Sequence, residues 1–386
     1  MSFFLTLIAI FVITDLLWWV SSWRRLKRPG FRAIVSLFAL SQLVGLGLVL
    51  GARWLNASWA TTLPRPLISV IFLWHVLVAL PWVIIYISST LVRGVRSLLI
   101  RRKRVEEIPS GQGITRREWL RAGVTLAPVV LTAGGAFLGE WQLERFRMRR
   151  MTLPIAGLPT ALNGLTIAHV TDIHVGHFTH GKVLEEIVRA TNDLNADLVL
   201  MTGDLINMAL RDLPMGIELM RGFRAPGGVF FCEGNHDLFE DPARFRREVR
   251  RAGLPFLYEE GATTSVRGNP IQILGTAWSH NDDGHKHSME NLRRQRDPKA
   301  FPIVLAHHPH AFDFADEFPL MLSGHTHGGQ LMLAEDVGFG PWMFRYWSGL
   351  YEKAGRTLVV SNGTGNWFPV RINAPAEIVH LTLKPA

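Results

Sequence analysis

The sequence Leu165-Thr-Ile-Ala-His-Val-Thr-Asp-Ile-His174 joins an apolar run to a carboxylate and an imidazole. Its first six residues, Leu165–Val170, are mostly aliphatic and predict a buried β-strand. Asp172 and His174 follow the end of that strand, two positions apart. Because side chains alternate in extended backbone, residues at this spacing project to the same side. The stretch therefore predicts a strand that presents two potential metal ligands to one point.

The same arrangement recurs farther along the chain. Each later polar run follows a predicted strand: Thr202-Gly-Asp204, Gly234-Asn-His-Asp237, Ala306-His-His-Pro309 and Ser323-Gly-His-Thr-His-Gly-Gly329. Oxygen and imidazole donors without thiolates favour Mn, Fe or Zn over a structural zinc cage. A single Asp-x-His carries little information, but the ordered set of runs indicates one shared metal site.

Short apolar strands alternate with amphipathic helices through the second half of the chain. We predict strands at Leu165–Val170, Leu198–Thr202, Gly228–Cys232, Ile271–Gly275, Ile303–Ala306, Leu320–Leu322, Leu358–Ser361 and Ile378–Leu383, with helices at about 181–194, 211–223 and 241–252. This alternation indicates an α/β domain with largely parallel strands. Open α/β sheets build their sites beyond the carboxyl ends of strands, where the polar runs lie.

Charge divides the chain near residue 150. Residues 1–150 contain 20 Lys and Arg against 6 Asp and Glu, whereas residues 151–386 contain 21 against 26. The positive charge therefore belongs to the front of the chain, and we expect no nucleic-acid partner for the mildly acidic remainder. Cys232 is the only cysteine, which excludes intramolecular disulfides and thiolate metal cages.

The front of the chain has the composition of a membrane module. Residues 2–20, 31–51 and about 66–92 are each apolar over the roughly 20 residues that a spanning helix needs. A fourth segment, Ala122–Gly139, is shorter and rich in glycine. We predict a three-helix transmembrane module at 1–92, a basic cytoplasmic linker with the fourth segment at 93–150, and a catalytic domain at 151–386. Asp15 and His75 lie within spans, where Asp15 either snorkels or pairs with another helix.

Basic loop residues predict the orientation of this module. Five Lys and Arg follow the first segment, two follow the second and nine follow the third, so residues 93–121 are expected in the cytoplasm. Thr115-Arg-Arg-Glu-Trp-Leu-Arg121 opens the fourth segment and resembles a twin-arginine export signal; the alternative is a basic anchor for an ordinary span. The catalytic domain is then expected on the external, periplasmic side of the cytoplasmic (inner) membrane. Arg145, Arg147, Arg149 and Arg150 weigh against this orientation because they flank the other end of the segment.

The ordered series Asp-x-His, Gly-Asp, Gly-Asn-His-Asp, His-x-Pro and Gly-His-Thr-His resembles the calcineurin-like metallophosphoesterase superfamily. The resemblance covers residues 164–383, and the Gly-Gly-Gln330 that ends the last motif is similar to the bacterial membrane-associated branch. It implies a four-layer α-β-β-α sandwich with two mixed sheets inside, preceded here by the all-α membrane module. It also implies a centre of two divalent ions of Mn, Fe or Zn.

The resemblance assigns roles to individual residues. Asp172, His174 and His327 would hold one ion, Asn235, His307 and His325 the other, and Asp204 would bridge them. His236, next to Asn235 at the catalytic position, would protonate the leaving oxygen or stabilise the transition state. Within Ala306-His-His-Pro309 the motif spacing favours His307 over His308 as the ligand. His280 and Arg371 are candidates to bind substrate.

These features predict a membrane-anchored hydrolase of a phosphoester or pyrophosphate, with a lipid-linked or envelope substrate as an attractive choice. Two divalent ions activate water and neutralise phosphate charge, so no covalent nucleophile is required. The alternatives are a nuclease or nucleotidase of the same fold and a non-catalytic metal-binding membrane sensor. The aromatic segment Pro341–Trp347 is a lid, a patch that enters the lipid interface, or ordinary core.

Overall fold

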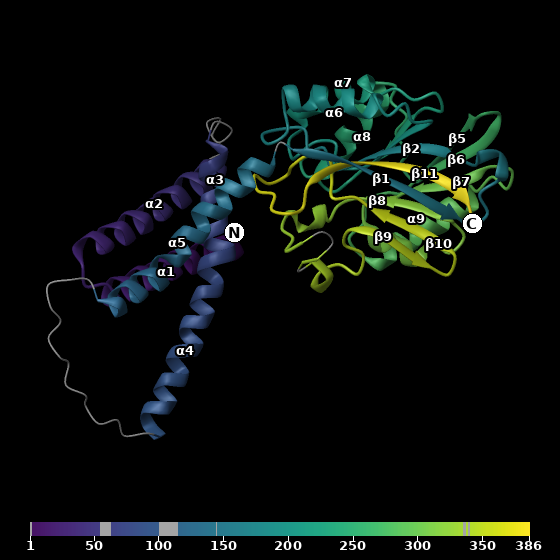
Figure 1. The fold of residues 1–386 in the computed structure, drawn as a ribbon. Helices are drawn as coiled ribbons and strands as arrows, with labels where there is room; N and C mark the ends of the chain where they lie inside the picture. The colour runs from purple at the N-terminus through teal and green to yellow at the C-terminus, as the bar shows by residue number, and fades with distance from the viewer. Residues whose placement is uncertain (1, 55–62, 100–114, 144, 335–336, 339) are drawn as a thin grey trace. The chain divides into compact units, whose positions relative to one another are not determined.

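The computed structural model describes residues 2–54, 63–99, 115–143, 145–334, 337–338 and 340–386. The chain forms two compact units, Met1–Glu140 and Trp141–Ala386 (Figure 1). The domain boundary predicted at residues 150 and 151 falls inside the first strand of the second unit, β1 (Phe146–Ile155). Of the predicted linker 93–150, residues 100–114 lie outside the described residues.

The first unit consists of long apolar helices. They are α1 (Ser2–Arg25), α2 (Pro29–Trp54), α3 (Arg65–Phe72), the π-helical segment η2 (Leu73–Ala79), α4 (Leu80–Leu99) and most of α5 (Arg116–Leu143). By length and composition, four stretches suit a membrane span: Leu5–Arg25, Pro29–Gly51, Arg65–Arg96 and Arg116–Leu143. These stretches contain most of the four predicted segments, and the fourth continues as one helix through Pro128 despite its glycines.

Asp15 and His75 pair with each other inside this unit. His75 Nε2 lies 3.0 Å from Asp15 Oδ2, and Trp74 Nε1 donates to Asp15 Oδ1 at 2.5 Å. His75 Nδ1 lies 2.7 Å from the carbonyl oxygen of Ile71, so that nitrogen carries a proton. All three polar side chains are buried, and the pair joins α1 to η2. Pairing between helices, rather than snorkelling, therefore accounts for Asp15.

The second unit contains two mixed sheets. One has the order β1-β11-β2-β3-β4, with β2 (Leu165–Val170), β3 (Leu198–Thr202), β4 (Val229–Cys232) and β11 (Ala376–Pro385). The other has the order β5-β6-β7-β8-β10-β9, with β5 (Glu260–Val266), β6 (Asn269–Gly275), β7 (Phe301–Leu305), β8 (Leu320–Ser323), β9 (Gly349–Lys353) and β10 (Arg356–Val360). Strands β2, β3 and β4 run parallel, as do β6, β7, β8 and β10, whereas the edge strands β5 and β9 pair antiparallel.

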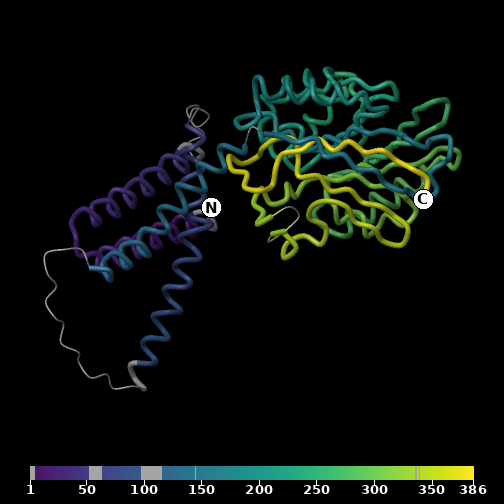
Figure 2. The backbone as a smooth tube through the Cα atoms, viewed as in Figure 1, coloured from purple at the N-terminus to yellow at the C-terminus, as the bar shows by residue number. Residues whose placement is uncertain are grey.

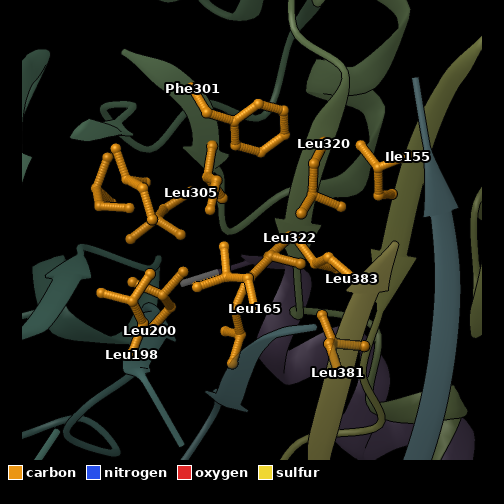
Figure 3. Close-up of a cluster of buried hydrophobic side chains, with 14 of the residues drawn as sticks. Ile155, Leu165, Leu198, Leu200, Phe301, Leu305, Leu320, Leu322, Leu381 and Leu383 are labelled. Carbon is orange, nitrogen blue, oxygen red and sulfur yellow. The ribbon is translucent and has the colours of Figure 1, made fainter. Parts of the chain in front are cut away.

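Alternating side chains on these strands build the layers. Leu198 and Leu200 of β3 face the other sheet and pack in a core with residues of β7 and β8, including Leu305 and Leu322 (Figure 3). Val199 and Met201 face the opposite way and pack on α6 (Lys182–Asn192), α7 (Leu213–Gly222) and α8 (Pro242–Arg251). The outer face of the second sheet is covered by α9 (Asp282–Arg294) and the η6 turn (Pro309–Phe314). The predicted four-layer α-β-β-α sandwich is confirmed (Figure 1).

Strand β1 was not predicted, because its alternating arginines read as a basic membrane flank. It pairs in parallel with β11, so the first and last strands of the second unit lie side by side (Figure 2). Arg147 Nη2 lies 3.0 Å and Arg149 Nη1 3.7 Å from oxygens of Glu377, which has no exposed surface. These arginines therefore neutralise a buried carboxylate of the folded domain.

Candidate metal centre

The predicted ligands follow strands of both sheets. Asp172 and His174 come after β2, Asp204 after β3, Asn235 after β4, His307 after β7, and His325 and His327 after β8. These seven side chains are called the ligand cluster below. Because the carboxyl ends of the parallel strands meet at one edge, the topology brings them together.

The local backbone differs from the extended chain on which the spacing argument rested. Asp172, His174, Asp204, His325 and His327 all have positive φ, between 51° and 72°. Non-glycine residues rarely adopt this conformation, although Asp and His tolerate it better than most. Left-handed turns, rather than strand alternation, therefore aim these side chains at a common point. Such clustered strain is typical of functional sites.

The first predicted ligand set is compact and buried. His327 Nε2 lies 3.0 Å from Asp172 Oδ1, and His174 Nε2 lies 2.9 Å from His327 Nε2. A β-carbon on Gly324 would overlap the carboxylate of Asp172, which explains the glycine that precedes the two histidines. Three potential donor atoms thus face one another within 4.8 Å.

The second predicted set meets at the side chain of Asn235. His325 Nδ1 lies 2.9 Å and His307 Nε2 3.2 Å from Asn235 Oδ1. The ring of His308 lies 4.8 Å from that of His325, and its Nδ1 accepts the backbone N–H of His310 at 3.2 Å rather than facing Asn235 in any described hydrogen bond. The structure therefore places His307, rather than His308, among the predicted ligands.

Asp204 connects the two sets. Its Oδ2 lies 3.5 Å from His174 Nε2 and 3.2 Å from His307 Nε2. Its other oxygen accepts the backbone N–H of His236 at 2.8 Å, and a β-carbon on Gly234 would overlap it. One carboxylate oxygen is thus shared between both ligand sets.

The protonation states of the cluster suit cation binding. Burial lowers the pKa of His174 and His327 and takes the pKa of His325 to about 3, so these imidazoles are neutral near pH 7. Burial alone would raise the pKa of Asp172 and Asp204, but the neighbouring histidines outweigh it and lower both values. Metal ligands must be neutral imidazoles and ionised carboxylates, so these donor atoms fit divalent ions.

His307 is the exception in the cluster. Burial lowers its pKa, but Asp204 and Asp172 outweigh burial and raise the value to about 9. His307 Nδ1 lies 2.6 Å from the carbonyl oxygen of Thr202, so that nitrogen is the donor and Nε2 faces Asp204. A cation between Nε2 and Asp204 would replace the proton that the two share here.

His236 lies beside the cluster and is held by backbone. Its Nδ1 donates to the carbonyl oxygen of Asn207, and its ring stands edge-on to His174 with centroids 4.5 Å apart. Burial, reinforced by His174, lowers its pKa to about 4. The imidazole is therefore oriented with Nε2 free to act on a bound group.

The two predicted substrate residues lie elsewhere than expected. His280 is exposed, and none of its described contacts reaches the cluster; Trp278, two residues earlier, packs its ring 4.9 Å from that of His325 and 5.4 Å from that of His307. The sequence feature that could have identified Trp278 is its position just after the end of strand β6, because the predicted ligands also lie just after the ends of strands.

Arg371 has no exposed surface, so in this structure it cannot touch a ligand that arrives from solvent. Its guanidinium donates to Asn366 Oδ1 at 2.6 Å and to carbonyl oxygens of Asn362, Gly365 and Ala374 at 2.6–3.1 Å. Burial lowers its pKa to about 10, which still leaves it charged. Arg371 therefore fastens the loop behind the cluster.

The aromatic segment Pro341–Trp347 divides between surface and core. Trp342 and Met343 are 88% and 76% exposed, whereas Tyr346 and Trp347 are buried. Phe344 lies between them and packs its ring 5.7 Å from that of His325.

Comparison with known proteins identifies the fold's family. Residues 165–329 match the family model described as calcineurin-like phosphoesterase. A transmembrane protein with metallophosphoesterase domain from Danio rerio is 30% identical over 61% of this chain and 56% of its own. The uncharacterized metallophosphoesterase YkuE of Bacillus subtilis is 29% identical over 70% of this chain and 98% of its own. Phosphodiesterase YaeI of Escherichia coli is 26% identical over 70% of this chain and 99% of its own.

Residues 165–329 thus match a calcineurin-like phosphoesterase domain. The predicted superfamily and fold class are supported for this domain, and the relatives are named metallophosphoesterases or, in one case, a phosphodiesterase. The chain spans little more than half the length of three of the relatives it matches: 56% of the Danio rerio protein, 61% of one from Campylobacter jejuni and 52% of one from Caenorhabditis elegans.

Proposed function

We propose that the chain is a membrane-anchored phosphoesterase that uses two divalent ions of Mn, Fe or Zn. The observation that carries the proposal is Asp204, whose Oδ2 lies within 3.5 Å of a histidine from each ligand set. Asp172, His174 and His327 would hold one ion, and Asn235, His307 and His325 the other. When bound, the pair would supply a nucleophilic water and neutralise the negative charge of the phosphate oxygens.

The chain's own residues then position the ester. The Asp204 carboxylate fixes the backbone of His236 through its amide, and the Asn207 carbonyl fixes the ring. His236 is therefore pre-oriented to act at the departing oxygen. Because Nδ1 already donates to Asn207, His236 can donate a proton or a hydrogen bond to that oxygen only from an imidazolium form protonated at Nε2.

The alternatives are a nuclease or nucleotidase and a non-catalytic metal-binding sensor. Among the described residues, the hydrogen bonds, ion pairs and ring contacts of the ligand cluster include a single Lys or Arg, the buried Arg371. A nuclease needs cations along its polyanion, so the sparse cations at the cluster disfavour a nuclease, whereas a nucleotidase, whose substrate is a single nucleotide, remains an alternative. A sensor would not need the fixed His236, which disfavours the second.

We propose further that the four apolar helices anchor the domain in the cytoplasmic membrane with the catalytic side outside. Three of the four arginines that weighed against this orientation, Arg147, Arg149 and Arg150, are part of β1, where Arg147 and Arg149 pair with Glu377. Charges in a folded domain contribute little to topology, so they no longer oppose export. In the twin-arginine-like run Thr115–Arg121, the backbone N–H of Thr115 donates to Glu118 Oε2 at 3.1 Å, and the backbone N–H of Glu118 donates to Thr115 Oγ1 at 3.2 Å. The two residues therefore cap the start of α5. We propose recognition of this run by twin-arginine export machinery.

The activity is tested with the full chain in lipid nanodiscs, bis-p-nitrophenyl phosphate and added Mn²⁺. We expect metal-dependent release of p-nitrophenol by the wild type and a loss of at least about 10³-fold in Asp204→Ala, because both ions lose a ligand. Binding of metal without hydrolysis of this or other phosphoesters would favour the sensor.

A further inference from the structure

Two exposed aromatic side chains lie near His236. The ring of Phe239 lies 4.5 Å from that of His236, centroid to centroid, and Phe239 is 53% exposed. The ring of Trp367 lies 6.2 Å from that of His236 and 6.4 Å from that of His327, and Trp367 is 41% exposed. Phe239 follows β4, whereas Trp367 belongs to the loop between β10 and β11. Two separate loops thus bring apolar surface to the same imidazole.

A third exposed apolar side chain belongs to Met208. Met208 is 39% exposed and follows Asn207, whose carbonyl oxygen accepts from His236 Nδ1. Single exposed apolar residues are ordinary on a protein surface, but an aromatic and aliphatic group beside a reactive centre marks a binding surface. Met208, Phe239 and Trp367 are called the apolar rim below.

Polar recognition is sparse at this position. The described contacts of His236 are with Asn207, Asp204, His174, Phe239 and Trp367, none of which is a cation. The single cation in contact with the ligand cluster among the described residues, Arg371, is fully buried. The rim therefore offers dispersion and hydrophobic contact rather than charge pairing to whatever the phosphate carries.

We propose that the apolar rim is a subsite for a hydrocarbon group esterified to the phosphate. This inference rests on the proposed function, since it places the phosphorus at the ligand cluster. The hydrocarbon would lie against Phe239 and Trp367, with the sulfur and methyl of Met208 at its edge. Substrates of this class are amphiphilic phosphoesters, in which a charged phosphate adjoins an apolar chain or ring.

Binding of alkylphosphonates tests the subsite independently of catalysis. Methyl-, butyl- and octylphosphonate are titrated calorimetrically into the full chain loaded with Mn²⁺ in lipid nanodiscs, with empty nanodiscs as the blank for partitioning. We expect Kd to fall by about two- to threefold for each methylene up to butyl, because each buried methylene adds hydrophobic free energy. The heat capacity of binding should become more negative along the series.

Substitutions assign the effect to the rim. Phe239→Ala, Trp367→Ala and Met208→Ser should each bring the methyl-to-butyl ratio of Kd closer to one. Met215→Ala is the matched control, since Met215 is 43% exposed but lies on α7, and it should keep the wild-type ratio. Metal content is measured for every sample, so that a variant with a disturbed ligand cluster is recognised. The three substitutions lie in three different loops, so a local disturbance of one loop would not explain the same effect in all three.

The outcomes separate the two proposals. A chain-length dependence that the rim variants lose and Met215→Ala keeps supports the subsite. Equal Kd values for methyl- and butylphosphonate, or a dependence that survives every rim substitution, would overturn it, even in a chain that hydrolyses bis-p-nitrophenyl phosphate. A metal-loaded chain that shows the dependence but hydrolyses no phosphoester would overturn the proposed function and leave the subsite standing.

Discussion

Arg371 Nη2 lies 3.3 Å from His327 Nδ1, on the side of that imidazole away from Asp172. The same guanidinium bonds to three carbonyl oxygens of the surrounding loop and to Asn366. Gly363 of this loop approaches both His327 and Asp172 so closely that a β-carbon there would lie 2.8 Å and 2.9 Å from them. Arg371 therefore positions the loop that packs against the first ligand set.

Arg371→Lys should weaken the first metal site selectively. Lysine keeps the charge but cannot reproduce the fork of hydrogen bonds, so we expect metal content to fall from two ions to about one, together with a loss of stability on the order of 3 kcal/mol. Metal analysis and thermal unfolding measure the two effects. Arg356→Lys is the control, because Arg356 is also largely buried but donates to the carbonyl of Phe312, outside the cluster. Equal metal loss in both variants would show a general effect of unfolding.

His236→Ala should retain the metal and lose rate. His236 lies beside the ligand cluster without being assigned as a ligand, so two ions should remain, while hydrolysis falls by about 10²- to 10⁴-fold. The rate loss is measured across phosphodiesters whose leaving groups differ in pKa. A loss that shrinks as the leaving group becomes more acidic identifies proton donation; a constant loss identifies transition-state stabilisation alone. Full activity in the variant would remove His236 from the mechanism.

The Asp15–His75 pair should hold the helices of the first unit together. Asp15→Leu or His75→Leu leaves a buried polar partner unpaired, and we expect each to destabilise the unit by about 3–5 kcal/mol, with the double variant much less destabilised than the sum. The stabilities of the wild type, the two single variants and the double variant are measured by thermal unfolding of the full chain in nanodiscs, monitored by the circular dichroism of the helices. Gln42→Leu is the control, since Gln42 is buried with an oxygen that lacks a hydrogen-bond partner. Additive losses in the cycle would refute coupling.

Protease added to intact spheroplasts should digest the catalytic domain of the wild type. The loop charges and the Thr115–Arg121 run place that domain outside, and Arg116→Lys/Arg117→Lys should leave it protected because twin-arginine recognition requires both arginines. Protection of the wild-type domain until the membrane is broken would place the enzyme in the cytoplasm. Digestion in both strains would support an external domain and reject twin-arginine export.

The strands that carry ligands could be read from the sequence because each is a short aliphatic run followed by polar residues. Strand β2 has the bounds predicted for it, and β3 likewise. The edge strands β5 and β9 could not be predicted in this way: β5 is Glu-Gly-Ala-Thr-Thr-Ser-Val and buries little, so its pattern lacks an apolar face. The arginines of β1 make sense only once Glu377, some 230 residues later, lies opposite them.

Motif spacing likewise identified the ligand cluster but not its surroundings. Asp172 and His327 are 155 positions apart, and only the resemblance assigned them to one ion before the fold brought them within 3.0 Å. Arg371 was taken for a substrate contact because a lone arginine near the end of the domain gives no signal of burial. Phe239 and Trp367 carry no motif, and their role depends on exposure beside His236.

In the proposed centre, seven side chains hold two ions with Asp204 between them. Electron paramagnetic resonance of the Mn²⁺-loaded full chain detects such a pair of ions directly. Two Mn²⁺ ions that share one carboxylate should lie roughly 3.5–4 Å apart and couple magnetically. We expect a multiline spectrum from about two ions per chain in the wild type, and loss of the coupling in Asp204→Ala. A wild-type chain saturated with one uncoupled ion, or with two ions whose spectra add independently, would show that Asp204 does not join two ions in one centre.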